Sequence, residues 1–237
     1  HIEDATMDDV RNFFFRHYVP SNAILVVAGN VTVAQVRSLS EKWFGSIPSP
    51  AASVRKLPVE SPQNSKRILE VHEDVPASAL YKAYHMPGRF HRDFFAVDLM
   101  GDVLARGQSS RLYRKLIKEK EIFTSISAFT MGSIDPGLLV VNGRVKNGIS
   151  LRDAEEELNA IVDDFAGNGP LEEEVEKVKN QAYSTLEFGE VEVMNRAMNL
   201  AFAKLSGDAN YVNEEARLIE TVTADDIGRV ARNIMRE

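Results

Sequence analysis

Histidines are the residues of this chain best suited to hold a metal ion. There are five: His1, His17, His72, His85 and His91. A catalytic zinc site on a helix needs two histidines on one face with an acidic residue close by. Neither H-E-x-x-H nor H-x-x-E-H occurs in the sequence. His85 and His91 flank Pro87-Gly88, where a strand end and a helix start explain them better than a metal loop. We therefore expect no metal-ligating residue in this chain.

Nucleophilic and acidic groups also favour structural roles. Ser109-Ser110 follows Gly107 at an expected helix start, where serine usually caps the helix, and no G-x-S-x-G elbow surrounds the pair. The clusters Glu155-Glu156-Glu157 and Glu172-Glu173-Glu174 are expected in first turns of helices, where the helix dipole favours negative charge. The sequence therefore predicts no catalytic residue, and this chain alone is expected to be inactive as an enzyme.

The composition is that of a folded protein and argues against nucleic-acid binding, disulfides, thiolate metal sites and membrane-spanning segments. The 237 residues are 44% hydrophobic and 27% charged, enough for one large domain or two smaller ones. The net charge of −7 argues against nucleic acid, because phosphate binding needs a basic face. The absence of cysteine excludes disulfides and thiolate metal sites, and fits a bacterial periplasm or cytoplasm equally well. No apolar run is long enough to span a bilayer.

Hydrophobic periodicity predicts an α+β fold. Strands are expected at 23–28, 67–72, 79–85, 125–130 and 138–145. Helices are expected at 6–18, 32–45, 91–106, 110–118, 151–166, 171–188, 190–206, 209–220 and 224–235. Apolar residues of these helices are expected to face a core, among them Phe14, Trp43, Met194 and Met198. Strands followed by a run of helices indicate a sheet with helices layered on one face.

One internal repeat is visible. Residues 2–10 recur as 219–227, each with an apolar lead-in, an N-cap threonine, two first-turn aspartates and a β-branched residue. The match favours a duplication, in which the second copy stops at Glu237 before the equivalent of strand 23–28. We therefore expect a vacant sheet edge that strand 23–28 fills, either within one chain or between the chains of a swapped homodimer.

Four motifs in order resemble the pitrilysin/insulinase zinc metallopeptidases, also called inverzincins. They are Tyr18-Val19-Pro20-Ser21-Asn22, Trp43-Phe44-Gly45-Ser46-Ile47-Pro48, Gly107-Gln108-Ser109-Ser110-Arg111-Leu112-Tyr113 and the stretch 171–181. The resemblance implies an α+β domain that is duplicated to form a clamshell around an unfolded peptide. It further implies that residues 1–48 are the tail of a preceding catalytic domain, 49–64 a linker, and 65–237 a second peptidase-like domain without the zinc site.

The same resemblance indicates where substrate would bind. The second domain of the family contributes an arginine and, seven residues later, a tyrosine that contact substrate near the zinc. Ile117 and Thr124 occupy those positions here, and neither can replace a guanidinium or a phenol. Arg114 is a candidate substitute, although a solvated surface role is the commoner one for such a residue.

Three functions are compatible with these residues. The first is the substrate-enclosing domain of a zinc metalloendopeptidase, with zinc in an upstream catalytic domain or partner subunit. The second is a catalytically silent subunit or structural partner of an active family member, which the departures at Ile117 and Thr124 favour. The third is a stand-alone peptide-binding module. An H-x-x-E-H motif in the preceding sequence would separate the first function from the second.

Overall fold

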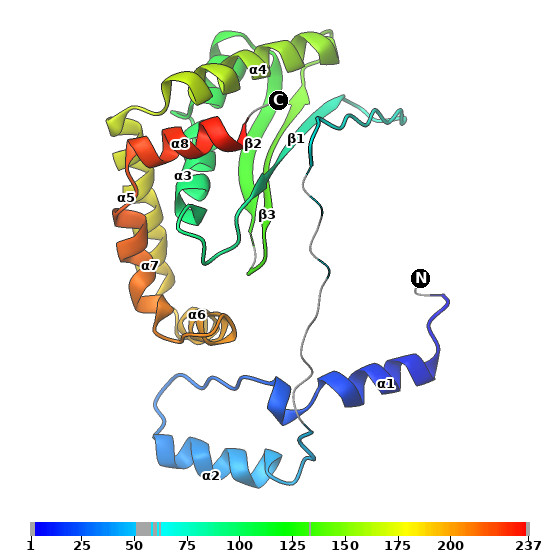
Figure 1. Cartoon of the computed structure of the whole chain (residues 1–237), viewed down its shortest axis with the longest axis vertical. Coiled ribbons are helices and arrows are strands. Elements are labelled where there is room, and N and C mark those ends of the chain that lie inside the picture. Colours follow the sequence, from blue (N-terminus) through cyan, green and yellow to red (C-terminus); the bar gives the residue numbers. More distant parts are fainter. Residues whose placement is uncertain (1–2, 51–57, 59–60, 62, 133, 236–237) are drawn as a thin grey trace. The chain divides into compact units, whose positions relative to one another are not determined.

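The computed structural model describes residues 3–50, 58, 61, 63–132 and 134–235 (Figure 1). The chain folds as two compact units. One comprises residues 1–63 with 187–213, and the other residues 64–186 with 214–237. The division into a tail over 1–48, a linker over 49–64 and a domain over 65–237 stays a prediction, and most of the expected linker lies outside the described residues.

The first unit contains helices at the predicted places. They are α1 (Met7–His17), α2 (Val33–Phe44) and α6 (Val193–Leu205). A short 3-10 helix, η1 (Pro20–Asn22), was not predicted. Thr6 and Thr32 begin α1 and α2 with a capping box, in which each threonine exchanges hydrogen bonds with the residue three positions later. None of the helices among the described residues is both long and apolar enough to cross a lipid bilayer.

Two predicted strands, 23–28 and 67–72, do not form. A strand needs a neighbour that accepts and donates backbone hydrogen bonds, and no described segment pairs with either one. The prediction that residues 23–28 fill a vacant sheet edge within the same chain is therefore wrong. Strand exchange between two chains stays a prediction.

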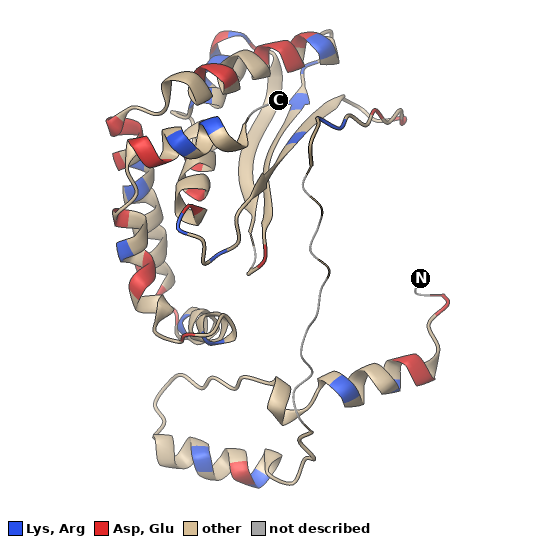
Figure 2. Cartoon of the chain, in the orientation of Figure 1, with Lys and Arg blue, Asp and Glu red and all other residues tan. Residues whose placement is uncertain are grey.

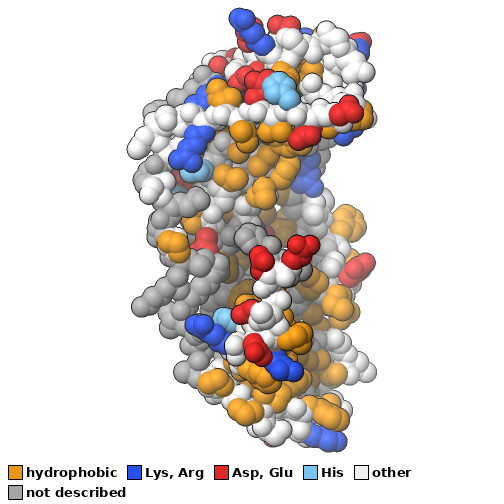
Figure 3. Space-filling model, turned by 90° about the vertical axis from the view of Figure 1, so that its right-hand side faces the viewer, with side chains coloured by type: hydrophobic (Ala, Val, Ile, Leu, Met, Phe, Trp, Pro, Cys, Tyr) orange, Lys and Arg blue, Asp and Glu red, His pale blue; other side chains and the backbone are white. Residues whose placement is uncertain are grey.

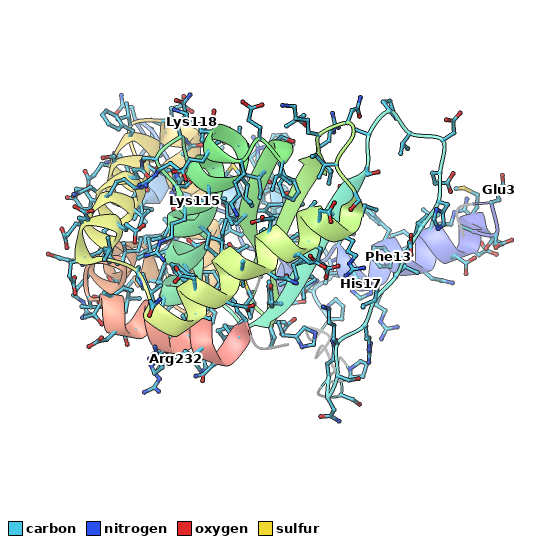
Figure 4. The ribbon with its side chains drawn as sticks, turned by 90° about the horizontal axis from the view of Figure 1, so that it is seen from above. Glu3, Phe13, His17, Lys115, Lys118 and Arg232 are labelled. Atoms are coloured by element: carbon cyan, nitrogen blue, oxygen red, sulfur yellow. The ribbon has the colours of Figure 1, made fainter. Side chains whose placement is uncertain are left out.

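The apolar faces of α1, α2 and α6 are exposed, contrary to the prediction that they face a core. Phe14, Trp43, Met194 and Met198 all have at least 49% of their surface exposed. On α1 the aromatic rings instead pack on neighbouring side chains. The ring centroids of Phe13 and His17 are 4.6 Å apart. Figure 4 labels both residues on this helix. A helix face becomes a core only against another layer, and no described element supplies that layer.

The second unit is built on a three-stranded antiparallel sheet. Its strands are β1 (Ala79–Met86), β2 (Phe123–Met131) and β3 (Gly137–Val145), in the order β1-β3-β2. Helices α3 (Phe94–Ala105), α4 (Leu151–Asn168) and α8 (Ala224–Ile234) lie on one side of the sheet (Figure 1). The predicted α+β architecture, with helices layered on one face of a sheet, is confirmed.

The covered face of the sheet is identified by its contacts. Leu139 and Val141 of the central strand are fully buried there. The Thr130 hydroxyl donates to Asp98 on α3 at 2.6 Å, and Lys82 hydrogen-bonds Asn159 on α4. Alternate residues of a strand point to opposite faces, so these contacts also fix which side chains face away from the helices.

Helices α5 (Glu172–Gly189) and α7 (Tyr211–Glu220) complete the chain. The cluster 172–174 occupies the first turn of α5 as predicted, whereas 155–157 lie one turn later in α4 than expected. The repeat has a structural counterpart, because Thr223 and Asp226 form the same capping box at the start of α8 that Thr6 and Asp9 form on α1.

An ion pair ties α8 to the start of α3. Two nitrogen atoms of Arg229 contact the Asp93 carboxylate at 2.6 and 3.0 Å. The side-chain hydrogen bond from Arg229 holds the pKa of Asp93 below its usual value. Arg92 and His91 also lie beside this carboxylate, and Asp226 shares the Arg229 guanidinium.

We expect Arg229→Ala to lower the free energy of unfolding at pH 7 by about 1–2 kcal/mol, because it removes two charge-assisted hydrogen bonds. A depressed carboxyl pKa stabilises the fold above the unfolded pKa of about 4, and this contribution disappears as pH falls through the folded value. The difference between the wild-type chain and the variant should therefore shrink below about pH 4. Urea denaturation at several pH values measures it.

The matched control is Arg152→Ala, since Arg152 pairs with Glu156 in an exposed i,i+4 arrangement and should contribute little. Equal effects of the two variants, or a difference independent of pH, would contradict the assigned role of Arg229.

Candidate functional site

The backbone between Leu112 and Ile126 is irregular in three successive places. A π-helix, η2 (Tyr113–Glu119), replaces most of the α-helix predicted at 110–118. Glu121 then has a φ of 51°, and the pairing of β2 with β3 shifts between Phe123 and Ser125. Such irregularities cost energy and occur often at functional sites. The segment is therefore a candidate functional site on the grounds of its backbone structure alone.

Ile117 and Arg114 both lie on the π-helix but differ in their surroundings. Ile117 is half-buried, whereas Arg114 is exposed. A π-helix has more residues per turn than an α-helix, so residues three apart no longer share a face. Arg114 and Ile117 therefore point in different directions from this helix. Lys115 and Lys118, labelled in Figure 4, are also exposed on this helix.

Thr124 is the extra residue of the β-bulge. Phe123 and Ile126 are buried on the covered side, and the bulge leaves both Thr124 and Ser125 exposed between them. The Thr124 hydroxyl donates to the Arg144 carbonyl oxygen at 3.2 Å. The π-helix packs against β2, so Ile117 and Thr124 lie on neighbouring elements.

Arg111 anchors the chain immediately before the π-helix. Its guanidinium contacts the Glu174 carboxylate at 2.8 and 2.6 Å, donates to the Gly169 carbonyl at 3.0 Å and lies over the ring of Phe165. Both charged side chains are 18% exposed. Burial alone would raise the pKa of Glu174, but hydrogen bonds from Arg111 and the Leu171 N–H outweigh it and the pKa is lowered.

The face of the sheet opposite the helices is uncovered, and we call it the open face. Its residues occupy every second position of each strand, with one extra residue at the bulge: Ala79, Tyr81, Ala83 and His85 on β1, Thr124, Ser125, Ser127, Phe129 and Met131 on β2, and Leu138, Val140, Asn142 and Arg144 on β3. All of them are exposed or half-buried except Val140, which is buried. Tyr81 is 67% exposed, Met131 58% and Phe129 45%. Figure 3, seen from the right of Figure 1, shows hydrophobic side chains gathered in its upper part, where the sheet lies.

No candidate metal centre is present in the described part of the chain. No group of three histidine, aspartate or glutamate side chains there is placed to hold an ion. The hydroxyl of buried Ser110 donates to the Gly107 carbonyl at 2.7 Å, and Ser109 accepts from Lys177 at 3.2 Å. The Ser110 hydroxyl thus stabilises the preceding turn, and the helix cap predicted for this serine pair is not among the hydrogen bonds of the described residues.

Sequence comparison identifies this architecture. The pattern of the peptidase M16 inactive domain matches residues 4–182. The chain belongs to the peptidase M16 family. This membership confirms the resemblance to zinc metallopeptidases and to their non-catalytic domain. M16 relatives include a zinc protease of Helicobacter pylori, 25% identical over 75% of this chain and 41% of its own length. Another is an uncharacterised zinc protease of Streptomyces coelicolor, 26% identical over 99% of this chain and 52% of its own length.

The same M16 architecture is found among solved structures. The crystal structure of a Helicobacter pylori protease matches 99% of this chain with a TM-score of 0.90 at 22% identity, and 57% of that protease is covered. This likeness shows the fold. The chain spans about half the length of the M16 relatives it matches.

The sequence suggested Ile117 and Thr124 as substrate positions, which stays a prediction, and it did not reveal the open face on which Thr124 lies. Tyr81, Phe129 and Arg144 were not singled out. The alternation of buried and exposed residues along the strands was readable, but it does not show which face a helix layer covers. That information required the contacts of α3 and α4.

Proposed function

We propose that this chain is the non-catalytic, substrate-enclosing domain of a zinc-dependent metalloendopeptidase. It helps hold an unfolded peptide while a zinc-bearing half, in the same polypeptide or in a partner subunit, hydrolyses it. The open face of the sheet is the observation that carries this proposal. A sheet covered on only one side presents a wall of outward side chains, against which an extended chain can lie.

Two further observations support the assignment. The family is that of the M16 inactive domain, and its relatives are named zinc proteases. The described residues contain no group suited to hold zinc, so hydrolysis requires a metal held elsewhere. The positions proposed to contact substrate in this domain are Ile117 and Thr124. Arg114 is a weaker candidate, because it does not share a face of the π-helix with Ile117.

A second candidate function is a catalytically silent subunit or structural partner of an active M16 protein. Ile117 and Thr124 favour it, since neither provides the charge or phenol expected of a substrate-binding pair. In that case the open face would contact protein permanently. Homodimerisation by exchange of residues 23–28 would fit this function better than the first.

The whole protein tests the proposal. We expect it to hydrolyse a fluorogenic peptide, to lose that activity on treatment with a zinc chelator and to regain it when zinc is added. This chain alone should bind no stoichiometric zinc and hydrolyse nothing. A whole protein that holds zinc but neither binds nor hydrolyses any peptide would support the silent-subunit function instead.

A further inference from the structure

The three strands of the sheet contain no aspartate or glutamate. The chain as a whole has 35 acidic residues, and Figure 2 shows them concentrated on the helices. The three strands contain one lysine, Lys82, and one arginine, Arg144. Lys82 points to the covered face, where it hydrogen-bonds Asn159. The open face therefore carries no carboxylate, although the protein has a net charge of −7.

Arg144 is the guanidinium of this face and is available to a ligand. Its side chain is exposed at one end of β3, and the described residues supply it with no ion-pair or side-chain hydrogen-bond partner. Many exposed arginines of this chain pair with a nearby acid, as Arg152 does with Glu156. A guanidinium binds a carboxylate in a bidentate manner and does so more strongly when water is excluded.

The rest of the open face carries apolar, hydroxyl, amide and imidazole side chains. Tyr81, Phe129 and Met131 present large exposed side chains, while Ser127 and Asn142 hydrogen-bond each other across β2 and β3. Aromatic and thioether groups contact apolar side chains with little geometric demand. From Leu138 to Arg144 the strand advances about 20 Å, at about 3.4 Å per residue, which is the length of about six extended residues.

We propose that the open face selects an extended peptide segment of about six residues with apolar or aromatic side chains and a carboxylate at the end that meets Arg144. The carboxylate belongs either to an acidic side chain or to the C-terminus of the peptide. The inference rests on the proposed function, whose substrate class it names. Basic segments are disfavoured, because the face offers them no acid and Arg144 repels them.

The test compares peptides that differ at one terminal position, in the whole protein. The peptides share an apolar stretch and end in glutamate, glutamine or lysine with an amidated C-terminus, and a fourth ends in glutamine with a free carboxylate. We expect glutamate, the free carboxylate or both to be preferred over amidated glutamine by about threefold to tenfold in kcat/KM. The fourth peptide distinguishes a terminal from a side-chain carboxylate.

Two variants test whether the peptide preference comes from the open face. Arg144→Glu should reverse the order of the glutamate and lysine peptides. Phe129→Ser should weaken the apolar peptides by about tenfold and spare a glycine- and serine-rich peptide. Arg152→Glu makes a comparable charge reversal on exposed α4 and should change neither preference.

Binding of the same labelled peptides to zinc-free whole protein, followed by fluorescence anisotropy, makes the result independent of catalysis. If peptides bind with the predicted preference but no hydrolysis occurs with zinc, the selection stands and the peptidase function fails. If hydrolysis is chelator-sensitive but Arg144→Glu leaves the order unchanged, the selection is wrong and the function stands. If the whole protein binds no peptide either with or without zinc, both the proposed selection and the proposed function are wrong.

Discussion

Replacing Arg111 by alanine is expected to lower the free energy of unfolding by about 2–4 kcal/mol. The substitution leaves the Glu174 carboxylate largely buried and without its counterion. It also removes the donor to the Gly169 carbonyl, which follows α4, and the stacking on Phe165. Chemical denaturation of the purified chain measures the loss.

Conservative variants separate the parts of this interaction. Arg111→Lys retains the charge but loses the bidentate geometry, so we expect it to recover less than half of the lost stability. Arg217→Ala is the control, because Arg217 pairs with Glu214 in an exposed i,i+3 arrangement and should matter little. Similar losses for Arg111→Ala and Arg217→Ala would show that Arg111 does not anchor the turn between α4 and α5.

The second large effect is expected at the proposed substrate positions. Ile117→Arg combined with Thr124→Tyr should strengthen peptide binding in the transition state by about 1–3 kcal/mol, roughly fivefold to a hundredfold in kcat/KM of the whole protein. Thr124 already faces outward from its bulge, so a tyrosine ring there can reach over the open face. Steady-state hydrolysis of a fluorogenic peptide measures the gain.

Thr124→Phe paired with Ile117→Arg is the control for the phenol. It supplies the same ring without the hydroxyl and should give a smaller gain. Unchanged or reduced hydrolysis in the tyrosine variant would mean that these two positions do not contact substrate.

Most of the second unit could be predicted from sequence, because its periodicities come from layers that are present. Helices α3, α4, α5, α7 and α8 and the three strands lie within a few residues of their expected places. The strand predictions at 23–28 and 67–72 were wrong for one physical reason. An apolar run indicates that a segment prefers burial, but the partner that would bury or pair with it is not encoded in the run itself.

The irregular segment was beyond sequence reasoning for a different reason. A π-helix and an α-helix use the same residue types, and their difference lies in whether an N–H bonds to the fifth or the fourth preceding carbonyl. Here the Lys120 N–H bonds to the Lys115 carbonyl. Likewise a bulge is defined by two strands together, so the sequence around Thr124 alone could not reveal it.

The π-helix and the β-bulge allow the number of residues between Leu112 and Ile126 to vary without moving these two buried residues. A π turn holds one residue more than an α turn, and the bulge holds one residue that β3 does not match. Buried Leu112 and Ile126 mark the two ends. A deletion that converted the π-helix to an α-helix, or removed the bulge, could shorten the connection by one residue while both ends stayed in place. Insertions and deletions here would thus change the direction of the side chains at Ile117 and Thr124 and leave the core intact. The proposed substrate positions could then change while the rest of the domain kept its structure.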